Sequence, residues 1–144
     1  MPAAARPGAA VATLPDVDCP CGRTGGRRQR LRLAACCGPY LDGLQRAPDA
    51  EALMRSRYTA FVRERADYLL ATWHPAHRPV SLAFEPGAKW LGLDVRAHRV
   101  TGPDTAEVEF VARHRVGGRA VRLHERSHFV RLPQGWVYVD GDIL

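Results

Sequence analysis

The four cysteines of the chain lie close together, as Cys19-Pro20-Cys21 and as the adjacent pair Cys36-Cys37. Thiolates are preferred zinc ligands, and a structural zinc ion takes four of them in tetrahedral geometry. Two close pairs suit that geometry, although C-x-C and C-C differ from the common C-x-x-C spacing. The competing interpretation is four free or disulfide-linked thiols. If all four bind one ion, no coordination position stays open, so we expect a structural rather than a catalytic zinc site.

The segment between the two cysteine pairs is rich in arginine. No acidic residue occurs between Cys19 and Leu41, and the whole chain has a formal net charge of +6. Such a cluster can hold phosphate or an acidic protein surface, but a solvated loop with a composition-driven arginine surplus is the competing interpretation. No aromatic residue interleaves the arginines, so a base-stacking platform is unsupported. The arginines are Arg23, Arg27, Arg28, Arg30 and Arg32.

A carboxylate occupies an unusual position in the second half of the chain. The alternation of period two from Val121 to Phe129 places Glu125 and Ser127 on the same face as apolar residues. A glutamate there can serve as a general base or as a ligand anchor. The competing interpretation is a buried ion pair with Arg55 or Arg57. The other candidates for a shared pocket are His114, Tyr58 and Trp73, with Trp136 or Tyr138 from the last strand.

Two helices are predicted ahead of this region. Pro48-Asp49 provides a cap, after which Met54, Tyr58 and Phe61 fall on one stripe, most simply explained as core packing. After a break near Arg65, a second short helix is expected to start at Asp67 and to end at His74-Pro75. Leu69 and Trp73 would line its inner face.

The remainder reads as an antiparallel meander. Strands are expected over Leu91–Val100, around Phe110, and on both sides of a two-residue turn at Gly117-Gly118, with another turn at Pro133–Gly135. Helices followed by a meander predict an α+β fold, in which the helices cross one face of a curved sheet and leave a cone-shaped hollow.

Several sequence strings resemble the bacterial YchJ family. Cys19–Gly22 (CPCG) and Cys36–Gly43 (CCGPYLDG) are similar to a SEC-C motif, a short zinc-binding segment. The remaining strings that resemble the family are Ala50–Tyr58, Thr72–Pro75, Trp90–Leu93, Leu123–Phe129 and Trp136–Gly141. The resemblance implies one zinc ion held by Cys19, Cys21, Cys36 and Cys37 and an NTF2-like fold for the rest, but it implies no reaction.

The resemblance also suggests how the chain is divided. We expect a disordered tail over residues 1–17, a SEC-C-like module over 18–46 and an NTF2-like domain over 47–144. The second cysteine pair comes later than the family pattern has it, because a long arginine-rich insert separates Cys21 from Cys36. The insert either bulges from an intact site or marks a site whose metal affinity has decayed.

Three functions compete on this basis, and an enzyme is the less favoured outcome. In the first, the Cys module docks a protein or ribonucleoprotein partner while the cone acts as scaffold. In the second, the cone around Glu125 binds a small molecule or performs acid–base chemistry; in the third, the arginines bind nucleic acid. A metal at His74 and His77 is disfavoured, and His124 and His128 are expected to be exposed or at a homodimer surface.

The chain carries no long apolar run and no signal-peptide pattern. We therefore expect a cytoplasmic protein with no membrane association.

Overall fold

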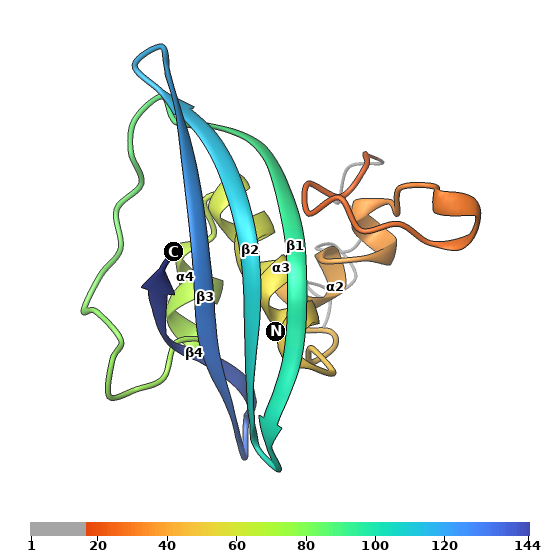
Figure 1. The fold of residues 1–144 in the computed structure, drawn as a ribbon, viewed down its shortest axis with the longest axis vertical. Helices are drawn as coiled ribbons and strands as arrows, with labels where there is room; N and C mark the ends of the chain where they lie inside the picture. The colour runs from red at the N-terminus through yellow and green to blue at the C-terminus, as the bar shows by residue number, and fades with distance from the viewer. Residues whose placement is uncertain (1–16) are drawn as a thin grey trace, which may run out of the picture.

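A computed structural model describes residues 17–144, and it has the expected α+β architecture (Figure 1). Four long strands form one antiparallel sheet in the order β1-β2-β3-β4. The expected tail lies outside the described residues except for Val17, whose carbonyl accepts a hydrogen bond from the Leu33 amide. The elements are η1 (Gly26–Arg28), η2 (Leu33–Ala35), α2 (Gly38–Leu41), α3 (Ala50–Val62), α4 (Ala66–Ala71), β1 (Lys89–Gly102), β2 (Thr105–Val116), β3 (Arg119–Leu132) and β4 (Gly135–Ile143).

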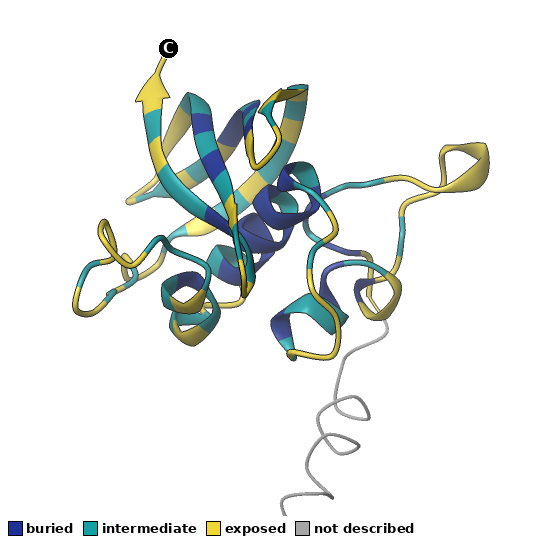
Figure 2. Cartoon of the chain, turned by 90° about the horizontal axis from the view of Figure 1, so that it is seen from below, coloured by how far each residue is buried: buried dark blue, intermediate teal, exposed yellow. Residues whose placement is uncertain are grey.

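Helix α3 is the central element beneath the sheet. It begins where expected, because the Asp49 carboxylate accepts a hydrogen bond of 2.8 Å from the Ala52 amide and so satisfies a free donor of the first turn. Most of its residues are buried, and it lies across one face of the sheet (Figure 2). Its apolar stripe therefore meets the sheet rather than solvent.

The second helix differs from its predicted bounds. Asp67 was expected to cap it, but α4 starts at Ala66 and the Asp67 carboxylate instead pairs with the Arg65 side chain at 3.1 Å. The helix also ends at Ala71, before the expected end, because Trp73 leaves it to form a parallel bridge with Tyr138. Trp73 is thus held by β4 rather than by α4.

The two turns of the second half are where they were expected. Gly117 and Gly118, with φ of 57° and 80°, connect β2 to β3 in the left-handed conformation that a two-residue hairpin requires. Pairing of Phe110 with Glu125 and of Val108 with Ser127 keeps these side chains on one face. Strand β1 is longer than Leu91–Val100 and contains irregularities in its pairing with β2.

The cysteines belong to the same hydrophobic core as the sheet and helices. Cys19, Cys21 and Cys37 are almost completely buried and join one cluster with Leu33 and α3. Beyond this core, residues 23–32 (hereafter the arginine loop) project as an exposed arm, yellow in Figure 2. In the part of the chain that is described, no helix is long and apolar enough to cross a bilayer.

Candidate functional site

The four cysteine sulfurs converge on one point. All four Sγ atoms lie within 4.8 Å of one another, with Cys21 and Cys36 at 3.7 Å and Cys36 and Cys37 at 4.0 Å. A regular tetrahedron of sulfurs around zinc at about 2.3 Å has edges of about 3.8 Å. The donor set therefore fits a tetrahedral zinc ion in both chemistry and spacing.

The long insert leaves this cluster intact. The Cys19 amide donates to the Leu31 carbonyl and the Cys36 amide to the Leu33 carbonyl, so the end of the insert is tied directly to the cluster. Within the insert, Thr24 and Arg30 form an antiparallel bridge. The insert is thus a folded arm that bulges from four assembled cysteines.

Helix α3 and the insert surround the cysteines with polar groups. The Thr59 hydroxyl lies 3.6 Å from Cys19 Sγ, and Arg55 donates to the Cys21 carbonyl at 3.0 Å. Arg30 donates to the Cys19 carbonyl at 3.3 Å. These two guanidinium groups place positive charge where four thiolates and one divalent ion would leave a net charge of −2.

The thiols compete for protons in the absence of a cation. Hydrogen bonds from Cys21, and then from Cys36 and Cys37, lower the pKa of the Cys19 thiol. The hydrogen bond to Cys19, followed by those to the other two thiols, raises the pKa of Cys37. Four thiols this close cannot all ionise alone, and a bound divalent cation removes that conflict.

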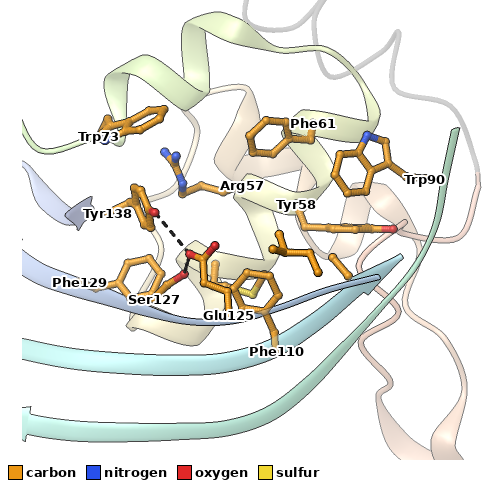
Figure 3. Close-up of a pocket in the computed structure, with 13 residues that line it drawn as sticks. Arg57, Tyr58, Phe61, Trp73, Trp90, Phe110, Glu125, Ser127, Phe129 and Tyr138 are labelled. Atoms are coloured by element: carbon orange, nitrogen blue, oxygen red, sulfur yellow. Dashed lines mark hydrogen bonds between the residues drawn. The ribbon is translucent and has the colours of Figure 1, made fainter. Parts of the chain in front are cut away.

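A cavity of about 310 Å³ fills the hollow between α3 and the sheet (Figure 3). Its wall is mostly aromatic and aliphatic, with one cation and one carboxylate. Small-molecule sites are typically concave and largely apolar with a few polar groups, and the cavity has these properties. Its lining residues are Met54, Arg57, Tyr58, Phe61, Trp73, Trp90, Phe110, Ala112, Leu123, Glu125, Ser127, Phe129 and Tyr138.

Glu125 is held in the wall by two hydroxyl groups. Its Oε2 accepts a hydrogen bond of 2.5 Å from Ser127 and one of 3.3 Å from Tyr138 (Figure 3). Burial, and then the negative charge of Glu125, raise the pKa of Tyr138 to about 12, so this hydroxyl stays a donor. Gly141 lies directly behind the carboxylate, and a Cβ there would collide with it.

The ion pair considered for Glu125 is wrong for both arginines. Arg55 pairs with Glu51 at 2.9 Å. Arg57 lies in the cavity wall but donates through Nη1 to the Leu69 carbonyl and to the Thr72 hydroxyl, each at 2.8 Å. In the described residues its guanidinium makes no ion pair with Glu125. The Leu69 carbonyl and the Thr72 hydroxyl, at the end of α4, take the place of the carboxylate as acceptors.

One pocket candidate lies outside this cavity. His114 stacks on Trp90 with ring centroids 4.7 Å apart and borders a smaller neighbouring space of about 190 Å³. Trp90 lines both spaces, but His114 lines only the smaller one and so does not join the other candidates in the cavity. Four of the five candidates, Glu125, Ser127, Tyr58 and Trp73, do line the cavity.

Trp90 was not anticipated in the cavity wall. Its strand carries a pairing irregularity between Trp90 and Gly92, and this shift breaks the alternation that would have assigned the tryptophan to the inner face. Gly141 was not expected at the site either. Its place behind Glu125 follows from the pairing of Gly141 with Ser127 between β4 and β3, which the local sequence does not reveal.

Three further histidines have local partners. On the outer sheet face, His124 Nε2 lies 2.7 Å from Glu109, and His128 Nε2 lies 2.9 Å from Asp142. His74 Nδ1 accepts from the Ala76 amide, which occupies one of its two nitrogens. These contacts explain the three residues within one chain and leave the homodimer as a prediction.

Residues 49–141 match the family described as "YchJ, middle NTF2-like domain". A UPF0225 protein of Polaromonas naphthalenivorans is 65% identical over 130 residues, covering 86% of this chain and 96% of that relative. A UPF0225 protein of Methylibium petroleiphilum is 55% identical over 138 residues, covering 95% and 94%.

Two solved structures share the fold. The solution structure of a SEC-C motif containing protein from Rhodopseudomonas palustris aligns with a TM-score of 0.75 and 31% identity, over 89% of this chain and 99% of the other. The crystal structure of a SEC-C motif containing protein from Psychrobacter arcticus aligns with a TM-score of 0.73 and 31% identity, over 88% and 82%. The expected NTF2-like fold with an N-terminal cysteine cluster is confirmed.

Proposed function

The chain belongs to the YchJ family, also named UPF0225, and from this membership we propose that it is a zinc-binding protein whose NTF2-like cone holds a small molecule. The observation that carries the proposal is the cavity of about 310 Å³ with Arg57 and Glu125 in its wall. From the sequence alone, docking of a partner by the Cys module was the favoured function. The geometry favours the cone, because two charged groups there line an apolar cavity, whereas the described residues of the arginine loop line no comparable cavity.

The zinc ion in this proposal is structural. Cys19, Cys21, Cys36 and Cys37 would supply all four ligands and leave no position for substrate, so the metal would stabilise the fold around it. None of the four is bridged as a disulfide. Reduced thiols support the further proposal of a cytoplasmic location.

Binding fits the cone better than acid–base catalysis. Glu125 receives two hydroxyl donors, which hold its carboxylate in one orientation and make it a fixed anchor. None of the residues that line the cavity is a histidine, lysine or cysteine, so neither Ser127 nor Tyr138 has a neighbouring base other than this carboxylate. We therefore favour a binding protein over an enzyme.

Native mass spectrometry and elemental analysis of the purified protein test the metal. One zinc per chain is expected, and the double variant Cys36→Ser/Cys37→Ser is expected to lose it. Four titratable thiols and no metal in the wild-type protein would contradict the proposal.

Calorimetric titration with indole, a small neutral aromatic probe, tests the cavity. Saturable binding of one indole per chain is expected, and Ala112→Phe, which fills the cavity from β2, is expected to abolish it. The matched control is Ala97→Phe on the outer face, opposite Glu109. Indole binding that survives Ala112→Phe, or no binding to a folded wild-type protein, would refute the small-molecule function.

A second function has one observation in its favour. Arg27 and Arg28 are exposed in the middle of the arginine loop. Their φ angles of 58° and 59° are left-handed, a backbone conformation that non-glycine residues adopt at a cost in energy. Such a projecting, positively charged tip supports docking of an acidic protein or ribonucleoprotein. Comparison of pull-downs by the wild type and by Arg27→Gln/Arg28→Gln tests it, and ribonuclease treatment separates the two kinds of partner. Unchanged capture by the double variant would remove this function.

A further inference from the structure

The cavity in the cone contains two opposite charges that no salt bridge of the described residues joins: burial lowers the pKa of Arg57, and the charge of Glu125 partly opposes this. Arg57 comes from α3 and Glu125 from β3, and in the described part of the chain they form no ion pair. Groups of opposite charge in a mostly apolar wall normally pair, because burying an unpaired charge is costly. Because no direct hydrogen bond joins these two described residues, each keeps hydrogen-bonding positions that a ligand can use.

Arg57 retains hydrogen-bonding capacity toward the cavity. Only Nη1 donates to protein acceptors, while Nε and Nη2 have none among the described residues. The guanidinium is 4.8 Å from the Tyr138 ring and 5.1 Å from the Trp73 ring, and these two rings fix its position (Figure 3). Burial lowers the pKa of Arg57 only to about 10, so it carries a full charge at neutral pH.

Glu125 has the complementary spare capacity. Its Oε2 is occupied by Ser127 and Tyr138, and Oε1 has no hydrogen-bond donor in the described residues. The remaining wall consists largely of aromatic and aliphatic side chains, including Phe110 and Phe129. A ligand that satisfies this cavity must therefore combine an anionic group, a cationic donor and an apolar body.

Resting on the proposed small-molecule function, we infer that the cone selects a small aromatic zwitterion, with its carboxylate on Arg57 and its ammonium group on Glu125. A carboxylate forms charge-assisted hydrogen bonds with a guanidinium, and an ammonium does so with Oε1. The aromatic body would lie against the rings of the wall. An anion alone would face Glu125 unfavourably, and a cation alone would face Arg57 unfavourably.

Four probes that share one ring system test this inference by calorimetry: tryptophan, tryptamine, indole-3-propionate and indole. Tryptophan is expected to bind most tightly, because it alone carries both charges. Glu125→Gln should weaken tryptophan and tryptamine about tenfold or more and should leave indole-3-propionate unchanged or tighter. Glu109→Gln, the same change on the outer sheet face, is the control and should alter none of them.

Arg57 is tested by the opposite pattern. Arg57→Gln should weaken tryptophan and indole-3-propionate but not tryptamine, and Arg57→Lys should restore part of the difference. If the Gln variant fails to fold in a thermal unfolding scan, the Glu125→Gln pattern decides alone. Equal affinity for all four probes overturns the inference while indole binding upholds the small-molecule site. Absence of binding by every probe, indole included, overturns both.

Discussion

At the residue scale, the position of Glu125 depends on the glycine behind it. Gly141 on β4 pairs with Ser127, and its missing side chain is the space that the Glu125 carboxylate occupies. Any larger residue would have to displace that carboxylate from its two hydroxyl donors. The glycine is therefore part of the candidate site although it contributes no functional group.

Gly141→Ala is accordingly expected to weaken tryptophan binding about tenfold, because Glu125 loses its fixed orientation. The measurement is calorimetric titration, with thermal unfolding to show that the fold persists. Gly26→Ala is the matched control, because a Cβ at Gly26 meets nothing within 4 Å. Unchanged affinity in Gly141→Ala would mean that the carboxylate orientation is unimportant.

Thr59 is expected to hold a ligand of the cysteine cluster in place, as Gly141 does for Glu125. Its hydroxyl is 3.6 Å from Cys19 Sγ, and it is completely buried. Thr59→Val keeps the shape and removes the donor to a bound thiolate, so zinc affinity should fall about 10- to 100-fold. Competition with a chromogenic chelator measures this. Thr59→Ser retains the hydroxyl and should stay within about threefold of the wild type; equal losses in both variants would argue for packing instead.

At the element scale, α3 serves both candidate sites from different faces. Thr59 and Arg55 approach the cysteines, while Arg57, Tyr58 and Phe61 line the cavity. The 3.6-residue period makes this possible, because neighbouring positions point in different directions. Whatever stabilises α3 therefore supports the metal cluster and the cone together.

The N-terminal cap of α3 provides the test of this dual role. Asp49→Ala removes the acceptor for the Ala52 amide and should cost about 1 kcal/mol of unfolding free energy. Urea denaturation followed by circular dichroism measures the loss, and Asp49→Asn, which keeps a side-chain oxygen, should recover most of it. A full loss in the Asn variant would show that charge, not the cap hydrogen bond, matters.

At the scale of the whole molecule, the Cys module and the cone share one core. Leu33, Cys19 and Cys37 are buried in the same cluster as Val108 and Phe129 of the sheet. The proposed boundary near residue 46 therefore divides the sequence but not the packing. A structural metal in a shared core stabilises the whole chain by its binding free energy.

Removal of zinc is thus expected to lower the stability of the sheet as well as that of the Cys module. Differential scanning calorimetry should show one transition that moves to lower temperature after chelation. Leu33→Ala should also lower the transition temperature. Its cost in unfolding free energy should be about 2–5 kcal/mol, since the side chain is fully buried. Two separate transitions, with only one sensitive to chelator, would instead establish independent domains.

The sequence by itself determined the α+β fold, the hairpin turns, the cap at Asp49 and the inner face that carries Glu125 and Ser127. These features depend on residue type and periodicity within a short stretch of the chain, so they can be read without knowledge of distant contacts. Only the tertiary structure decided that Arg57 donates to the Leu69 carbonyl instead of Glu125, that His114 lines a separate smaller space, and that the insert leaves the four sulfurs together. Each of these depends on residues distant in the chain, and the inward position of Trp90 depends also on a pairing irregularity in β1.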